Sequence, residues 1–317
     1  MKVLDTFRFA GSVEPKAIDS FYQHLENPKN VMRLKTLSPG EKIIVITQNL
    51  KESILRWGRD LGFDLKNRML PITRIHFVES KSLNQKYSKS KGIFTKTNKP
   101  FRGATDLDTF ITYICIDLYN GRLRPYPSLA HTICHELVHS IAFKKVDISK
   151  IDEKNNYFTT VRSGFKDFNT NAFLLLDECI TELTNHYLIA YYWKNFAELQ
   201  KLYKISQTEL SLDTSIVIDA LIEELANKSD TKYEEILHLV QKDYIVGSKE
   251  FLTIVSRHFG KKAVNLLSNL EPVRLKNIDS IIRIAEGIRL NTLINKLATY
   301  KKNQKFDFLT FYLNPEF

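Results

Sequence analysis

The first seventy residues alternate between helical and extended patterns of apolar positions. They predict a helix after Pro15, a strand over 42–47, and a second helix over 50–61 that Gly62 would end. We interpret this part of the chain as an N-terminal α/β extension.

A β-rich stretch follows, in which each short run is rich in β-branched or aromatic residues. Strands are predicted over 72–78, 93–97 and 110–118, and they could form one small sheet. Pro127 then suits the first turn of a helix that runs to about residue 143, because its missing N–H is not needed there.

Beyond this helix the pattern becomes helical almost throughout. A short hairpin with Gly164 at its turn precedes a long apolar helix over 172–193. Further helical periodicity covers 199–210, 214–226, 233–242, 249–258, 262–269 and 278–299. The predicted fold class is α+β, with divisions at 1–70, 71–195 and an all-helical 196–317.

Composition suits a folded protein, with 317 residues of which 43% are hydrophobic. There is no run of about eighteen apolar residues and no apolar leader at the N-terminus, so we expect a cytoplasmic protein with no membrane contact. The odd number of cysteines predicts reduced, buried thiols and no disulfide framework at Cys115, Cys134 and Cys179.

The chain is basic, with a net charge of +10 and an excess of lysine between residues 80 and 105. Such a charge would suit nucleic acid or acidic peptides, but it is also typical of a solvated loop. No zinc finger, Walker loop or RNA-binding aromatic signature accompanies it, so nucleic acid is not the expected partner.

The helix over 127–143 contains a His-Glu-x-x-His motif. His135 and His139 are four residues apart and therefore project from one face, where two imidazoles can bind one Zn²⁺ ion. Glu136 lies about 100° around the helix axis. That position suits a general base acting on a metal-bound water.

A second polar stripe lies on the apolar helix over 172–193. Glu178, Thr181, Glu182 and Asn185 fall at i, i+3, i+4 and i+7, so they share one face. If this face meets the first helix, Glu178 completes three protein ligands and leaves a fourth position open for catalysis. Glu182, with Asn185 beside it, would then orient a metal-bound histidine.

Other residues compete for these roles. Glu182, Asp167 and Asp177 are alternative third ligands, although a buried helix face favours Glu178. His131 is one turn before His135. Three imidazoles spaced over two helical turns do not easily meet one ion, so it is interpreted less as a replacement ligand than as a support for the ligands, a substrate-cleft residue or a core histidine.

The two helices together resemble the gluzincin zinc peptidases, the group that includes thermolysin. In that family a glutamate ligand follows His-Glu-x-x-His on a later helix, with an acidic residue four positions on, as Glu178 and Glu182 are here. The resemblance covers residues 72 to 193 and implies a zincin-like catalytic fold. It also implies that the strand over 110–118 is the sheet edge that pairs with an extended peptide.

Two features depart from the family. The interval between His139 and Glu178 is longer than in thermolysin. No residue is assignable as the one that stabilises the oxyanion, and the candidates are Tyr157, His186, Tyr191 and His238.

The sequence therefore predicts a zinc metallopeptidase with a peptide or protein substrate and Glu136 as general base. The main alternative is a zinc protein without catalytic activity that binds a regulatory partner. A basic nucleic-acid-binding protein is a second alternative.

Overall fold

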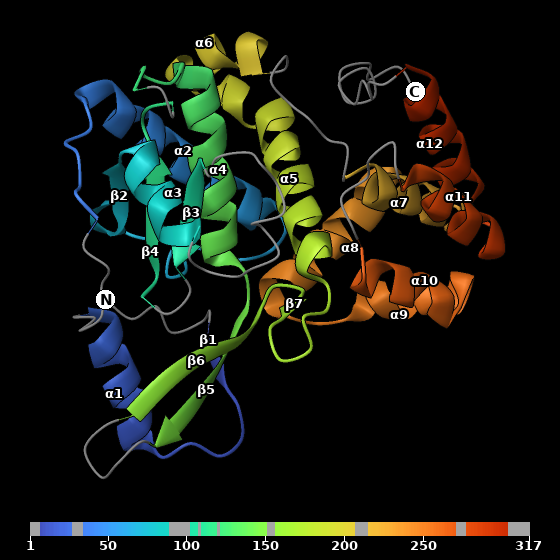
Figure 1. Cartoon of the computed structure of the whole chain (residues 1–317), viewed down its shortest axis with the longest axis horizontal. Coiled ribbons are helices and arrows are strands. Elements are labelled where there is room, and N and C mark those ends of the chain that lie inside the picture. Colours follow the sequence, from blue (N-terminus) through green and yellow to red (C-terminus); the bar gives the residue numbers. More distant parts are fainter. Residues whose placement is uncertain are drawn as a thin grey trace. The chain divides into compact units, whose positions relative to one another are not determined.

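Figure 1 shows the computed structural model of the protein. The structure describes residues 7–26, 34–88, 102–106, 109–118, 121–150, 156–206, 215–270 and 277–303. The predicted α+β class is confirmed. Contacts divide the chain into two compact units, the first formed by 1–141, 145–160 and 191–209 and the second by 142–144, 161–190 and 210–317.

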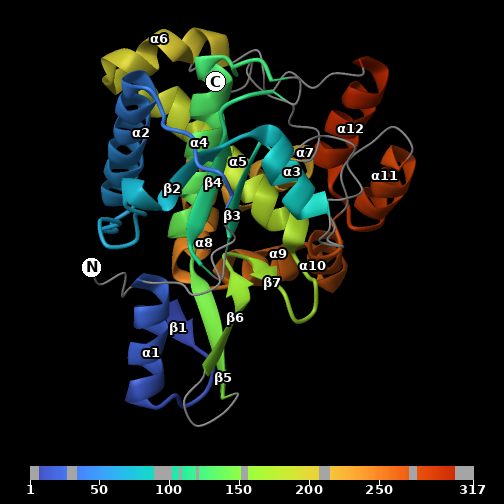
Figure 2. The same ribbon diagram turned by 60° about the vertical axis from the view of Figure 1, so that its left-hand side comes forward.

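A three-stranded sheet forms the centre of the first unit. β4 (Ile111–Cys115) lies between β2 (Ile75–Val78), which is parallel to it, and β3 (Gly103–Asp106), which is antiparallel. Figure 2 shows these strands side by side. All five residues of β4 are buried, as expected of a central strand.

This order corrects one expectation. The strand near 110–118 was predicted to be the sheet edge, but β4 is paired on both sides, and within the described residues β2 and β3 are the end strands of this sheet. The sequence gives no strong signal for β3 because Gly103–Asp106 has no alternation of apolar residues. The strand predicted over 93–97 lies outside the described residues.

Helices cover this sheet. α4 (Tyr126–Ile141) packs along β3 and β4, and α2 (Glu41–Asp60) packs against α4, as does α6 (Ala197–Ser206), which follows the short 3₁₀ helix Trp193–Asn195. α3 (Ser80–Ser88) contacts β4. The predicted helix over 127–143 is confirmed, whereas the first part of the basic stretch is helical and not a loop.

The strand predicted over 42–47 is wrong, because α2 is helical from Glu41 onward. The β-branched run in this segment suggested a strand. However, Ile46, Leu50, Ile54 and Trp57 recur at helical spacing and are all buried, so a helix buries one continuous apolar face. Packing of this face against α4 and α6 overrides the local β preference.

The buried Arg124 connects α4 to the sheet. Its Nη2 donates to the carbonyl and hydroxyl oxygens of Ser128 and to Oγ1 of Thr132, at 2.7 to 2.9 Å. Its Nη1 donates to the carbonyl oxygen of Cys115 at the end of β4, at 3.0 Å. These bonds hold the first two turns of α4 against the strand.

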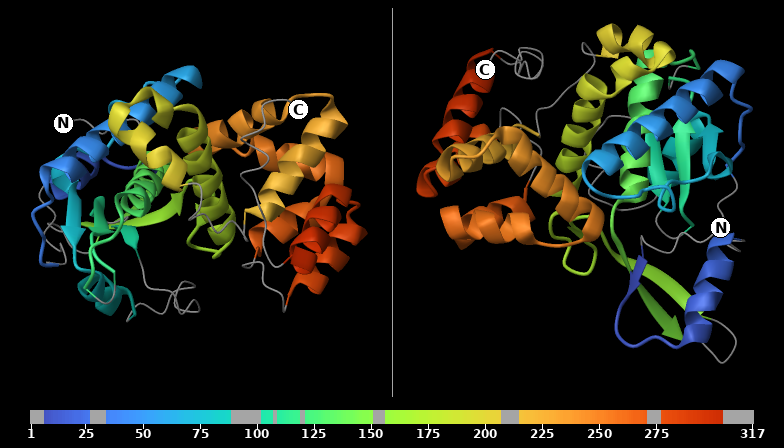
Figure 3. Two further views of the ribbon diagram at one scale, coloured as in Figure 1. Left: turned by 90° about the horizontal axis from the view of Figure 1, so that it is seen from above. Right: turned by 180° about the vertical axis from the view of Figure 1, so that it is seen from behind.

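A second layer of the first unit contains α1 (Pro15–Glu26), β1 (Phe7–Phe9) and β5 (Lys144–Lys150), as Figure 3 shows. β1 and β5 belong to a sheet of order β1-β5-β6-β7 that continues through β6 (Asn156–Ser163) and β7 (Lys166–Asp167). Edge-to-face contacts join the aromatic rings of Phe7 to those of Phe21 and Phe110. The helix predicted after Pro15 is confirmed.

The second unit is mainly helical. It comprises α5 (Leu174–Tyr191), α7 (Ile216–Ser229), α8 (Tyr233–Val246), α9 (Glu250–Phe259), α10 (Lys261–Ser268), α11 (Ile278–Gly287) and α12 (Asn291–Asn303). The long helix predicted over 278–299 is two helices, because the chain turns at Arg289, whose φ of 59° is left-handed. The other predicted helices are confirmed with shifted ends.

Three polar pairs connect α5 to α8. They recur every three residues along both helices, so they set the register of one helix on the other. The pairs are Thr181 with Tyr244 at 2.8 Å, Thr184 with Gln241 at 3.4 Å, and Tyr187 with His238 at 3.1 Å.

Within the described residues, no helix combines the length and apolar character needed to cross a bilayer.

Candidate metal and catalytic site

The two histidines of the motif converge on one point beside α4. Their Nε2 atoms are 3.1 Å apart and their ring centroids 4.8 Å apart. His139 is 8% exposed, so its ring is largely withdrawn from water. The helix therefore presents two nitrogen donors to the same small volume, as the spacing predicts.

The donor set fits Zn²⁺. A tetrahedral ion with Zn–N bonds of about 2.0–2.1 Å separates two nitrogen ligands by about 3.3 Å. The observed 3.1 Å between Nε2 atoms is close to this separation. Neutral imidazole is a ligand that zinc prefers, so both the chemistry and the spacing are suitable.

Glu136 is buried between α4 and β3. Oγ1 of Thr105 donates to Oε2 of Glu136 at 2.8 Å and is itself 3.0 Å from Oγ1 of Thr112 on β4. Where β3 passes the carboxylate, it has Gly103, at which a Cβ would lie 3.0 Å from Oε1. Strand β3 thus binds Oε2 of Glu136 through Thr105. Beside Oε1 it has Gly103, which has no side chain.

Glu178 is at the start of α5, where it meets the Gly164 hairpin. Lys166 on β7 places its Nζ 2.5 Å from Oε1 of Glu178 and 3.4 Å from Oδ2 of Asp177. Burial by itself would lower the pKa of the Lys166 ammonium, but the two carboxylates raise that pKa above its ordinary value. Lys166 is therefore a cation held beside the predicted third ligand.

Two groups of described residues have the composition and spacing of a metal site. In each, one ligand atom from every residue lies within 4.8 Å of the others. The first group is His135, His139 and Glu178, which are the three predicted ligands, and the second is His131, Glu182 and His186.

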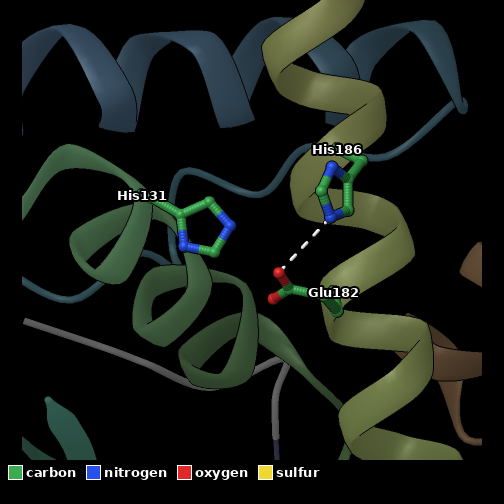
Figure 4. A group of neighbouring side chains, drawn as sticks. All are labelled: His131, Glu182 and His186. Atoms are coloured by element: carbon green, nitrogen blue, oxygen red, sulfur yellow. Dashed lines mark ion pairs between the residues drawn. The ribbon is translucent and has the colours of Figure 1, made fainter. Parts of the chain in front are cut away.

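Figure 4 shows the side chains of the second group. Oε1 of Glu182 lies 3.3 Å from Nε2 of His186, one turn further along α5, and His131 projects from α4. Glu182 was expected to orient a metal-bound histidine, and that role stays a prediction. Asn185, which was placed on the same stripe, is completely buried.

The residues proposed to stabilise an oxyanion are dispersed. His186 contacts Glu182, His238 contacts Tyr187, and Tyr191 is 37% exposed near the end of α5. The side chain of Tyr157 lies outside the described part of the chain. None of these contacts identifies one candidate as functional.

Sequence analysis did not identify two residues at this site. Thr105 was missed because β3 was not predicted, and Lys166 because its contact depends on how the hairpin folds back onto α5. The Gly164 turn was the one local signal for Lys166, since the hairpin it predicts is confirmed by pairing of Ser163 with Lys166.

The three cysteines are free and buried, as predicted. Burial raises the pKa of the Cys115 thiol to about 12 and raises that of Cys179 well above its ordinary value. In the groups of described residues that could hold a metal ion, none of the ligands is a cysteine.

Comparisons with protein-family models, with curated proteins and with solved structures find no match to this chain.

Proposed function

We propose that the protein is a zinc-dependent peptide hydrolase of the gluzincin type. The observation that supports this most directly is the 3.1 Å approach of the His135 and His139 Nε2 atoms on the helix that also bears Glu136. Two converging imidazoles would bind a metal ion, and an acidic residue between them in sequence would act on a metal-bound water.

His135, His139 and Glu178 would hold the metal. When bound, Zn²⁺ supplies a Lewis acid that polarises the scissile carbonyl and makes water more acidic. Three protein ligands leave one position for reactants, as in catalytic zinc sites and unlike closed structural ones. This favours an enzyme over the alternative of a zinc protein without catalytic activity.

Glu136 would move the proton. Thr105 occupies Oε2 of the carboxylate, so we assign proton transfer to Oε1, which faces Gly103. Oε1 would accept a proton from the attacking water and return it to the leaving amine. Burial of Glu136, which is 6% exposed, would keep bulk water from competing for this proton.

An extended peptide would pair with β3. Among the described strands of its sheet, β2 and β3 are at the ends, and β3 is the one that passes beside Glu136, at Gly103 and Thr105. Addition of a strand to a sheet edge is a common mode of peptide recognition. We therefore assign to β3 the peptide-pairing role that the sequence predicted for the strand over 110–118.

The proposal is tested by metal content and by Glu136→Gln. We expect the purified full-length protein to bind one equivalent of zinc and to cleave members of a proteome-derived peptide library, followed by mass spectrometry. Glu136→Gln should retain the zinc and lose activity by about 10²–10⁴-fold, the range for removal of a general base.

Equal cleavage by the wild-type protein and Glu136→Gln would reject the catalytic role of Glu136. Stoichiometric zinc with no cleaved peptide would support the regulatory alternative. Absence of bound zinc in metal-replete protein would reject both.

A further inference from the structure

A charged cluster surrounds Lys166, which forms ion pairs with Asp177 and with the predicted third ligand, Glu178. We propose that Lys166 is a built-in counter-ion that competes with the metal for Glu178 and so weakens zinc binding. The inference rests on the proposed function, because it takes Glu178 as a zinc ligand.

Lys166 bridges two consecutive residues of α5. Its Nζ lies 2.5 Å from Oε1 of Glu178 and 3.4 Å from Oδ2 of Asp177. The Lys166 side chain is 12% exposed and that of Asp177 is fully buried. At this low exposure the ammonium and carboxylates are poorly screened by water, so their attraction is strong.

The backbone fixes the position of Lys166. Oδ1 of Asp177 accepts the Phe165 N–H at 2.8 Å, and the Gly164 N–H donates to the Phe143 carbonyl at 2.7 Å. Gly164 has a φ of 53°, and a Cβ there would lie 2.3 Å from Oδ1 of Asp177. The backbone from which Lys166 extends is therefore held close to the start of α5.

A divalent cation bound to Glu178 would be repelled by the Lys166 ammonium. To bind zinc, the Glu178 carboxylate must either contact the metal and Lys166 together or break its ion pair with Lys166. In the first case the two nearby cations repel each other. Without metal, Lys166 offsets part of the negative charge of two carboxylates that would otherwise repel each other at close range. The lysine thus stabilises the metal-free protein and makes the zinc exchangeable.

Removal of the charge should tighten zinc binding. In Lys166→Met, and in Lys166→Gln, whose amide can still donate to Glu178, we expect the zinc Kd to fall by on the order of 10-fold, the scale on which groups around metal ligands act. Lys166→Arg keeps the charge and should not tighten zinc binding as the two neutral variants do. The readout is competition with a chromophoric zinc chelator, using the full chain.

The chain contains a matched control. Lys296 on α12 bridges two carboxylates of α7, with Nζ 2.6 Å from Oε2 of Glu223 and also in contact with Asp219. Its side chain is 14% exposed, close to that of Lys166. Lys296→Met should lower stability in the same way as Lys166→Met but leave the zinc Kd unchanged.

The outcomes separate this inference from the proposed function. Wild-type protein that binds zinc, with Lys166→Met and Lys166→Gln binding it equally or more weakly, would overturn the counter-ion role and leave the zinc site standing. A parallel gain in Lys296→Met would also overturn it. Wild-type protein that binds no zinc would overturn both proposals.

Discussion

Thr105 on β3 donates its hydroxyl hydrogen to Oε2 of Glu136 on α4 over 2.8 Å. The two residues are 31 positions apart in the chain, and the bond exists because α4 packs along β3. It gives the proposed general base one defined orientation. A test of Thr105 is therefore a test of whether that orientation matters.

Thr105→Val removes the hydroxyl and nearly preserves the shape of the side chain. We expect kcat on a cleaved peptide to fall about 10- to 100-fold, because a hydrogen bond to a charged group contributes about 1.5–3 kcal/mol. Zinc content should not change, since Thr105 contacts Glu136 and no proposed ligand. Thr105→Ser should retain most activity.

Thr47→Val provides the control for this substitution. Thr47 is a buried threonine of α2 in the same unit, and its hydroxyl donates to the Ile43 carbonyl at 2.7 Å. Loss of kcat in Thr47→Val equal to that in Thr105→Val would show a general effect of folding stability and not of Glu136 orientation.

Gly164→Ala should be strongly destabilising. The new Cβ would require a left-handed φ of 53° and would lie 2.3 Å from Oδ1 of Asp177 and 2.7 Å from Cε2 of Tyr244. Strain and overpacking together should lower the free energy of unfolding by about 2–4 kcal/mol. Urea denaturation in the presence of a chelator measures this loss without a contribution from bound metal.

Gly62→Ala separates the effect of backbone strain from that of overpacking. Gly62 also has a positive φ, of 86°, but a Cβ there would meet nothing within 4 Å. Its substitution should cost about 1 kcal/mol through backbone strain alone. Equal losses at both glycines would contradict the close packing of the Gly164 turn on Asp177.

Buried thiols should make the protein less stable in alkaline solution. Burial raises the pKa of Cys115 to about 12, whereas an unfolded thiol has a pKa of about 8.5. Below pH 8 the thiol is protonated in both states. As the pH rises above about 9, the unfolded chain releases this proton and the folded chain keeps it, so unfolding becomes more favourable.

Each pH unit above the pKa of the unfolded thiol should lower the free energy of unfolding by about 1.4 kcal/mol for Cys115. Urea denaturation between pH 8 and 10 should show this slope, and Cys115→Ala should reduce it. An unchanged slope in Cys115→Ala would show that this thiol ionises as easily in the folded protein as in the unfolded chain.

The pairing of His135 with His139 could be predicted because it depends only on helix geometry. Residues four apart on a helix share a face whatever the rest of the protein does, and the apolar pattern around them specifies the helix. The hairpin turn at Gly164 was predictable for a similar reason, since the requirement for a left-handed residue is local.

The segment over 42–47 shows why local preference can mislead. Its β-branched residues favour a strand, but α2 continues through it because Ile46 shares a buried helical face with Leu50 and Ile54. The energy of burying that face comes from other helices, which a short window of sequence does not contain.

The partners of the two acidic residues depend on packing between segments distant in sequence. Glu136 meets Thr105 through the pairing of β3 with β4, and Glu178 meets Lys166 through the fold of the hairpin onto α5. Linear order specifies neither contact, because each forms only when chain segments 12 or 31 residues apart come together. Helical periodicity therefore specified which of the proposed ligands share a helix face, whereas long-range packing determined the groups that surround them.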